Sequence, residues 1–426
     1  MNRRAFMKSG AMALVTGGLT PSFLERGIFS ADFLRGAGTF GNARGKVLIC
    51  LFQRGAADAL NMVVPFGEQA YYRLRPTIAI PQPTSGRAGA ALDLDGFFGL
   101  HPSLAPLNDL WRRGMLAPVH AVGSPSTTRS HFDAQDYMES GTPDVKSTRD
   151  GWLNRYLAVR GTCDECNAGA KPAPFQAVSM TQQTPRILQG QAAVVAMNSL
   201  DQFAIRTPAS QVERIEALYR TGSSDVVHAA GGEMVEAMRV LRAANPQQYI
   251  PQHGATYPRS QFGEHLRQIA QLIKSDVGLE VAFADVGGWD THVNQGGVNG
   301  QLANRFDDFA KSISALVTDL GDRMADVVIL TMSEFGRTAR QNGNAGTDHG
   351  HAGALFVIGG SVKGGKVFGR WPGLAMEQLN EGRDLALTTD FRHVFAEVAV
   401  KHLGAAKPDV LFPGFATPSS SWIGLF

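Results

Sequence analysis

Short, almost unbroken apolar runs constrain the fold of this chain more than any other feature. Residues 46–52 read KVLICLF and residues 326–332 read DVVILTM, so each run has the length of a strand. A strand that is apolar at every position must be covered on both faces, as in a parallel sheet flanked by helices. Similar runs occur at 117–122, 279–285 and 354–358.

Segments with helical spacing lie between these runs. Residues 301–320 repeat apolar side chains at intervals of three and four, which predicts a long amphipathic helix. Further elements are expected as helices at 103–113, from 130, at 150–159, 211–241 (two helices), 261–275 and 389–403, and as strands at 175–179 and 193–197. This alternation predicts an α/β fold, with a doubly wound, mostly parallel sheet and helices on both faces. We expect one domain at 45–426, with a helical insertion around 205–275.

The first residues predict an export signal. Arg3 and Arg4 come before an apolar stretch at 11–24, an order typical of a twin-arginine signal, although a frayed basic terminus is the alternative. Residues 1–40 are therefore predicted to be a signal peptide and spacer, recognised by the twin-arginine translocase. The stretch is too short for a membrane helix. We expect a periplasmic or otherwise extracytoplasmic protein, with no stable membrane span once the signal is removed.

Charge and cysteine content exclude several classes of protein. The net charge is +2 and the chain has no long basic run, which argues against a nucleic acid as partner. Three cysteines cannot form a disulfide framework. In an oxidising compartment, Cys163 and Cys166 favour a loop disulfide over a redox centre, and the sequence leaves their bonding open. Cys50 is predicted to be a buried thiol.

The residues beside the predicted strands carry most of the chemistry. Ligands in α/β folds bind where the carboxyl ends of the strands meet. The side chains expected there are Asp290 and His292 after 279–285, Glu334 after 326–332, and Asp348, His349 and His351 before 354–358. Carboxylate oxygens and neutral imidazoles are ligands for zinc, manganese or iron. Together these residues predict a metal or anion site.

Each of these residues also has a structural explanation. Asp290 can cap a turn after the two preceding glycines. His349 and His351 can be solvated in a glycine-rich loop. Glu334 can form a surface ion pair with Arg337.

A hydroxyl candidate precedes the helix that starts near residue 130. At a helix N-terminus, Ser130 would lie among free N–H groups that attract anions, which suits a nucleophile. Ser130 followed by Asp133 is equally an N-capping pattern. His131 is the alternative functional residue at this place, whereas His101 and His120 are expected to be structural.

Five segments resemble one protein family. They are FQRGAADALNMVVP (52–65), RSHFDAQDYMESG (129–141), GGWDTHVNQ (287–295), LTMSEFGRTARQNGNAGTDHGHAG (330–353) and GGKVFGRWPGL (364–374). They are similar to motifs of the bacterial family catalogued as domain of unknown function 1501 (DUF1501). The resemblance covers about residues 45–425, and the twin-arginine start also looks like that family.

The resemblance implies a fold and a chemistry. The DUF1501 family is similar in fold to the alkaline phosphatase and sulfatase superfamily, which has a doubly wound α/β sheet. Its members usually place two metals beside a serine, threonine or modified cysteine nucleophile that attacks a phosphate or sulfate ester. This chain has no Cys-x-Pro-x-Arg motif, so formylglycine sulfatase chemistry is not supported.

The resemblance also implies roles for particular residues. Asp290 and His292 resemble an Asp/His metal pair, and His349 or His351 resembles the late histidine ligand. Ser130 resembles the nucleophile by its position before a helix.

Two positions depart from the superfamily pattern. Glu334 stands where an Asp-His-Gly motif usually begins, but Phe335 cannot ligate a metal. Asp58 follows a turn after the usual first-strand aspartate, whose place Gln53 and Arg54 occupy. These departures put a second metal in doubt.

The sequence therefore predicts an exported, metal-dependent, hydrolase-like protein that acts on an anionic phosphate or sulfate ester. The cofactor would be one or two divalent ions of zinc, manganese, iron or calcium. The expected metal ligands are Asp290, His292, His349, His351 and Asp58; the expected catalytic residues are Ser130, His131 and Glu334; the expected anion-binding residues are Arg54 and Arg337. A planar guanidinium suits anionic oxygens.

The alternative is a non-catalytic binding or assembly protein on a degenerate hydrolase scaffold, since a fold does not determine a function. The missing ligand at Phe335 favours this alternative. Its partner would be another exported protein.

Overall fold

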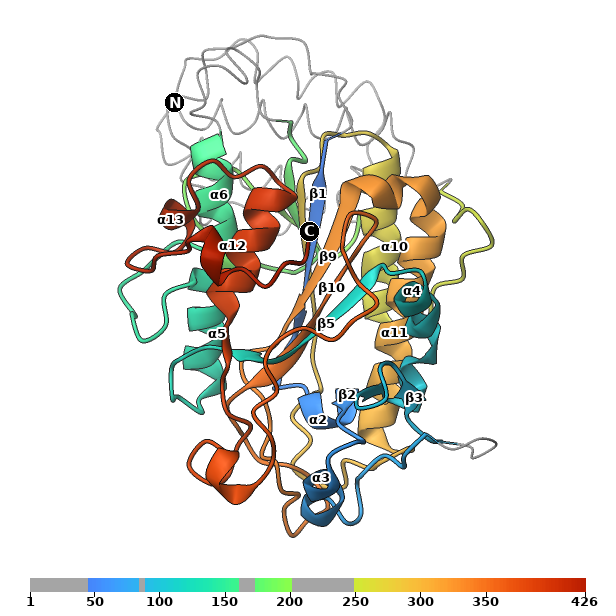
Figure 1. The fold of residues 1–426 in the computed structure, drawn as a ribbon. Coiled ribbons are helices and arrows are strands. Elements are labelled where there is room, and N and C mark those ends of the chain that lie inside the picture. The colour runs from blue at the N-terminus through green and yellow to red at the C-terminus, as the bar shows by residue number, and fades with distance from the viewer. Residues whose placement is uncertain (1–44, 84–88, 161–172, 201–248) are drawn as a thin grey trace, which may run out of the picture.

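The computed structural model of the chain describes residues 45–83, 89–160, 173–200 and 249–426. Within these ranges a large sheet runs through the molecule (Figure 1). It has eight strands in the order β11-β5-β10-β9-β1-β8-β6-β7. The strands are β1 (Val47–Gln53), β5 (Leu116–Gly123), β6 (Ala177–Ser179), β7 (Val195–Ala196), β8 (Val281–Val286), β9 (Val327–Met332), β10 (Gly353–Gly359) and β11 (Thr389–Asp390). In this sheet only β10 runs against the others, pairing antiparallel with β5 and β9.

Helices cover both faces of the sheet (Figure 1). One face is covered by α4 (Asn108–Arg112), α10 (Gln261–Lys274) and α11 (Gln301–Leu320), and the other by α5 (His131–Ser140), α6 (Trp152–Arg160), α12 (Phe391–Lys401) and α13 (Pro408–Leu411). The α/β architecture and the doubly wound, mostly parallel sheet predicted from the sequence are confirmed. The long amphipathic helix predicted at 301–320 has those bounds in α11.

The remaining elements are short. A small sheet joins β2 (Val63–Val64), β4 (Gly99–Leu100) and β3 (Leu92–Asp93). The short helices are α2 (Ala59–Met62), α3 (Gln69–Leu74), η3 (Pro102–Leu107), η4 (Arg186–Leu188), η6 (Gly321–Asp326), η7 (Met376–Gln378) and η8 (Ser419–Ser421).

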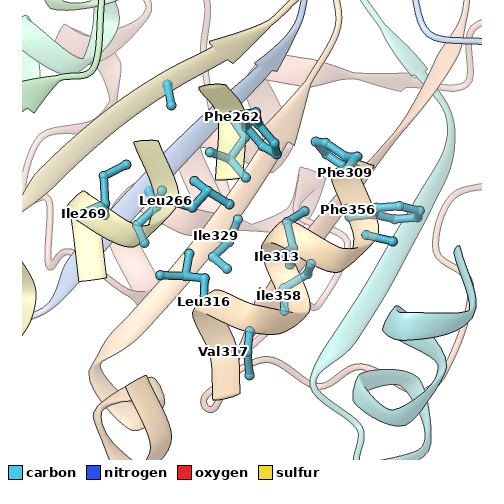
Figure 2. Packing of buried hydrophobic residues seen from close by; sticks show 14 of the residues in the cluster. Phe262, Leu266, Ile269, Phe309, Ile313, Leu316, Val317, Ile329, Phe356 and Ile358 are labelled. Atoms are coloured by element: carbon cyan, nitrogen blue, oxygen red, sulfur yellow. The ribbon is translucent and has the colours of Figure 1, made fainter. Parts of the chain in front are cut away.

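The side chains of β1 alternate between two hydrophobic cores. Ile49 and Leu51 lie in the core that contains α10 and α11, whereas Leu48 and Cys50 lie in the core that contains α6 and α12. Figure 2 shows the first core, where side chains of α10 and α11 pack beside those of β9 and β10. Burial on both faces explains why the sequence of β1 is apolar at nearly every position.

Two helix boundaries differ from the sequence prediction. The helix expected at 103–113 is divided into η3 and α4, and Pro106 lies inside η3. Proline has no N–H to continue an α-helical hydrogen-bond ladder, which accounts for the tighter first segment. Thr389–Asp390 forms the edge strand β11, and the helix α12 begins after it. The Asp390 side chain then accepts a hydrogen bond from the N–H of Arg392 and caps that helix.

Some predictions fall outside the described residues: the signal at 1–40, the helices at 211–241, and the pair Cys163 and Cys166. The described part of the predicted insertion around 205–275 contains α10, which packs against α11 on the sheet. Over the described ranges, no helix is both long and apolar enough to cross a membrane.

Two histidines buried in the fold are expected to make the protein acid-sensitive. The Nε2–H of His101 bonds to the carbonyl of Gly297 at 3.0 Å, and its Nδ1 accepts from the N–H of Ser103. His120 is held in the same way by the carbonyl of Val63 and the N–H of Ala121. Burial lowers the pKa of each histidine to about 4. The structural role predicted for both residues is thus confirmed.

The free energy of unfolding should fall as the pH decreases from about 6.5 to about 4. The unfolded chain binds protons in this window while the folded protein does not, so stability is complete above the unfolded pKa and lost below it. The loss is about 3 kcal/mol per histidine at most. Asparagine at position 101 keeps an acceptor for the N–H of Ser103 and cannot titrate. His101→Asn should therefore reduce the dependence of the free energy of unfolding on pH, measured by urea unfolding between about pH 4 and 6.5. His253→Asn, at an exposed histidine, is the control and should leave this pH dependence unchanged. An unchanged pH dependence in His101→Asn would contradict the role given to His101.

Candidate metal centre

The loops that carry the predicted site residues meet at one edge of the sheet. The strands β1, β5, β8 and β9 run in the same direction, so the loops after them emerge at their shared carboxyl edge. Because β10 is antiparallel, the loop before it reaches the same edge. A bridge between Arg337 and His349 joins the loop after β9 to the loop before β10.

Three histidines surround the carboxylate of Asp290. The Nε2 atoms of His292 and His349 lie 3.0 and 3.3 Å from Asp290 Oδ1, and the Nε2 of His131 lies 3.5 Å from Oδ2. Potential ligand atoms of His131, Asp290 and His349 all lie within 4.8 Å of one another. These residues come from the start of α5, the loop after β8 and the loop before β10. The sequence prediction that the strand-end residues gather at one place is therefore correct for this set.

The other ring nitrogen of each histidine contacts an oxygen acceptor. His131 Nδ1 lies 2.7 Å from Glu334 Oε1, His292 Nδ1 lies 2.9 Å from Asp348 Oδ1, and His349 Nδ1 lies 2.8 Å from the carbonyl of Arg129. Such acceptors favour a proton on Nδ1, and in a neutral ring the lone pair is then on Nε2. This arrangement is typical of metal-binding histidines, whose outer hydrogen bonds fix the ring orientation.

The converging Nε2 atoms fit a cation. The Nε2 atoms of His292 and His349 are 3.0 Å apart, so their two lone pairs repel unless a proton or a metal lies between them. Among the described residues, the buried Nε2 of His131 has no hydrogen-bond partner. The side chains of His292 and Asp290 are 38% and 43% exposed, so the centre is open to solvent. The donor set of three imidazoles and one carboxylate therefore fits a divalent metal ion.

Arg337 lies behind the cluster and fixes its carboxylate. Its Nη1 donates to Asp290 Oδ1 at 2.9 Å, and its side chain is fully buried. Burial acts to raise the pKa of Asp290, but the charge of Arg337, followed by those of His292 and His131, lowers that pKa below its ordinary value. Asp290 is thus held ionised, as a metal ligand must be.

Glu334 is held in a cradle of hydrogen-bond donors. Its Oε1 accepts from the N–H of Gly55 at 2.8 Å and from Gln135 Nε2 at 2.8 Å, while its Oε2 accepts from the N–H of Ala56 at 3.1 Å. Burial acts to raise the pKa of Glu334, but the hydrogen bonds from His131 and Gln135 lower it below its ordinary value. Glu334 is therefore a buried carboxylate that orients the ring of His131.

The glycine at position 55 allows this cradle to form. Gly55 has a φ of +117°, and a Cβ atom there would lie 2.7 Å from the backbone nitrogen of Asp290. Only glycine fits both the backbone conformation and this close approach. The loop after β1 thereby packs directly against the loop that carries the candidate ligand Asp290.

Glu334→Gln is expected to weaken metal binding by about 10- to 100-fold, the usual cost of losing an outer partner of a histidine ligand. The new amide group would face N–H donors that cannot accept its hydrogens. Isothermal titration with zinc would measure the change.

The matched control is Glu397→Gln. Glu397 is also buried, on α12, and accepts from the N–H groups of Ile423, Gly424 and Leu425. This control should destabilise the fold to a similar degree and leave the zinc affinity unchanged. Equal losses of affinity in the two variants would contradict a specific role for Glu334.

Other predicted site residues lie outside the group of converging atoms. Asp58 is buried and forms an ion pair with Arg75, 2.6 Å from its Nη1. Arg54 forms ion pairs with Glu139 and Asp285 at 2.9 and 2.6 Å. The metal role of Asp58 and the anion-binding role of Arg54 remain predictions, but both side chains have partners within the fold.

Ser130 and His351 lie next to cluster residues in the chain. Ser130 is the N-cap of α5, and its hydroxyl accepts a hydrogen bond from the N–H of Asp133 at 3.5 Å, so the capping interpretation is confirmed. Ser130 directly precedes His131 in the chain. The charges that act on His351 are those of Asp384, Arg129 and Glu381, and burial lowers its pKa. The ring of Phe335 stacks on His131, with centroids 5.0 Å apart.

The sequence did not identify three supporting groups. These are the carboxylate of Asp348 as partner of His292, the amide of Gln135 and the carbonyl of Arg129. Gln135 follows His131 by four residues on α5, so helical spacing places both on one face. That spacing was the available signal for Gln135; a backbone carbonyl such as that of Arg129 leaves none.

Fold and site together define an α/β protein with a histidine-rich candidate metal centre at the carboxyl edge of its sheet. Comparison with protein families then identifies the family: the chain belongs to the one described as Protein of unknown function (DUF1501), whose model matches residues 45–410. The family predicted from the sequence is thus confirmed.

Comparisons with individual proteins add little. No curated protein matches the chain. Among solved structures, one described as a 2-O GAG sulfatase is similar, with 9% sequence identity and a TM-score of 0.27. The match covers 76% of this chain and 66% of that one, so the chain spans slightly under two thirds of that protein.

Proposed function

We propose that this protein is an exported, metal-dependent hydrolase that acts on a phosphate or sulfate ester. One observation carries the proposal: three histidines direct Nε2 atoms at the Asp290 carboxylate while oxygen acceptors hold each Nδ1. His131, His292, His349 and Asp290 would hold the metal. A bound divalent ion would polarise an ester oxygen and lower the pKa of a nearby nucleophile.

The residues around the centre would position the reactants. Ser130, at the start of α5, would attack the ester or orient a water molecule. Glu334 would keep the ring of His131 in place, and Arg337 would keep Asp290 ionised. The buried guanidinium of Arg337 would act on the anionic ester through its charge.

The test is elemental analysis of the protein purified after native export, followed by assays with aryl phosphate, phosphodiester and aryl sulfate esters. We expect bound metal and turnover of one of these ester classes. Chelation should abolish the turnover and the metal should restore it. Ser130→Ala should retain the metal and lose turnover if the hydroxyl is the nucleophile. A folded protein that contains no metal and takes none up would contradict the proposal.

The second candidate is a binding or assembly protein. Phe335, which stacks on His131 and lies 5.1 Å from the ring of His349, favours it because an apolar side chain stands beside the centre where the superfamily has a ligand. A protein that binds metal but hydrolyses no ester in the panel would support this second candidate.

Export by the twin-arginine pathway is part of the proposal and rests on the sequence. Changing Arg3 and Arg4 together to lysine should retain the protein in the cytoplasm, because the translocase recognises the arginine pair. Cell fractionation and immunoblotting would measure this. Normal export of the double variant would contradict export by this pathway. The single variant Arg3→Lys, which keeps Arg4, is the comparison and should impair export less than the double variant.

A further inference from the structure

We infer that the centre holds one divalent cation of the zinc type, and that Asp58 and Glu334, the two other carboxylates predicted for this site, are held by the protein's own donors and bind no second cation. The inference rests on the metal site proposed above. It concerns the number and the kind of metal ions, which the proposed function leaves open.

Asp58 is neutralised from within the fold. Its Oδ2 accepts from Arg75 Nη1 and from Gln295 Nε2, each at 2.6 Å, and both the aspartate and the arginine are buried. The positive charge of Arg337 also acts on Asp58. Oδ1 of Asp58 has no hydrogen-bond partner among the described residues, but a cation there would be repelled by two guanidinium groups.

Donors of the fold hold both oxygens of the Glu334 carboxylate. An ionised carboxylate offers about four acceptor positions. In the described structure Glu334 receives the N–H groups of Gly55 and Ala56, the amide of Gln135 and the ring of His131. A metal at Glu334 would have to displace buried donors and leave them without partners, which costs about 1–3 kcal/mol for each.

The charges in contact with the ligands balance one divalent ion. With neutral imidazoles, the ionised groups that touch the side chains of the four ligands or belong to them are the carboxylates of Asp290, Glu334 and Asp348 and the guanidinium of Arg337. Three negative charges against one positive leave −2. One divalent cation neutralises this charge, and a second would add an excess charge of +2.

The donor atoms select the kind of metal. Three imidazole nitrogens and one carboxylate suit zinc and its neighbours, whereas calcium requires six to eight oxygen ligands. Calcium, one of the four metals predicted from the sequence, is the least compatible with this donor set.

The experiment measures metal content and metal environment without any substrate. Metal-free full-length protein is titrated with zinc and with calcium by calorimetry, and the zinc-loaded protein is examined by X-ray absorption. We expect one equivalent of zinc, at least 100-fold weaker calcium binding, an imidazole-rich nitrogen and oxygen shell, and no metal–metal distance near about 3.5–4 Å, where two-metal sites have theirs. Two equivalents, a metal–metal signal or preferred calcium would overturn the inference.

Asp58→Asn adds a matched variant. It should bind one equivalent of zinc with the affinity of the unchanged protein, because Asp58 is not a ligand; reduced stoichiometry or affinity in the folded variant would overturn that assignment. If the variant does not fold, the stoichiometry and the absorption spectrum of the unchanged protein still decide the question. One zinc without ester turnover keeps the inference and removes the hydrolase proposal, two metals with turnover do the reverse, and no metal removes both.

Discussion

Replacing His349 by alanine is expected to abolish stoichiometric zinc binding. The substitution removes the Nε2 atom that lies 3.0 Å from His292 Nε2 and 3.3 Å from Asp290 Oδ1, so the cation loses a ligand. The affinity should fall by more than the roughly 10- to 100-fold that the loss of an outer partner costs. His292→Ala should behave in the same way. Titration in competition with a chelator of known affinity would measure both.

His393→Ala is the matched control for these variants. His393 is a partly buried histidine on α12 that packs against Phe415, and it lies outside the described cluster. It should bind zinc like the unchanged protein. Wild-type zinc affinity in both His292→Ala and His349→Ala would eliminate the proposed centre.

Arg75→Met is expected to destabilise the protein by about 3–5 kcal/mol, the cost of leaving one member of a buried ion pair without its partner. Arg75 bonds to Asp58 Oδ2 and to Asn61 Oδ1, and it donates to the carbonyls of Thr338 and Ala339. Its loss therefore leaves a buried carboxylate without its ion-pair partner and two buried carbonyls without a donor. The midpoint of urea unfolding would report the change.

The control is Arg113→Met. Arg113 forms an exposed ion pair with Asp109, which should contribute at most about 1 kcal/mol. The double variant Arg75→Met with Asp58→Asn should recover part of the lost stability, because it removes the uncompensated charge. Equal losses of stability in Arg75→Met and Arg113→Met would show that the buried ion pair contributes no more to stability than the exposed one.

The fold could be predicted where one signal dominated. The apolar run of β9 and the repeated apolar spacing of α11 each allow one interpretation, and the structure agrees with both. Elements with competing signals were predicted less well. Pro106 lies in the helix expected at 103–113, which is divided into two segments. Thr389–Asp390 lies beside β5 and pairs with it as an edge strand. The local sequence does not encode that position.

The candidate site could be predicted at the level of loops but not of side-chain directions. Strand order brings Asp290, His292 and His349 to one edge, so their positions after or before strands were informative. Spacing alone did not show that the charges acting on His351 are those of Asp384, Arg129 and Glu381, whereas His349 contacts Asp290. Nor did it show that Asp58 would be paired with Arg75, because that contact depends on the path of the chain through α3.

The distance along the chain between the candidate ligands has a consequence for the stability of the loops that carry them. His131 and His349 are far apart in the sequence, and Asp290 and His292 come from a third loop. A cation held by all of them would act as a reversible cross-link that closes large loops, and closing large loops restricts the freedom of the unfolded chain. The bound cation would then also hold the loops at the carboxyl edge of the sheet together, so that they could not unfold separately.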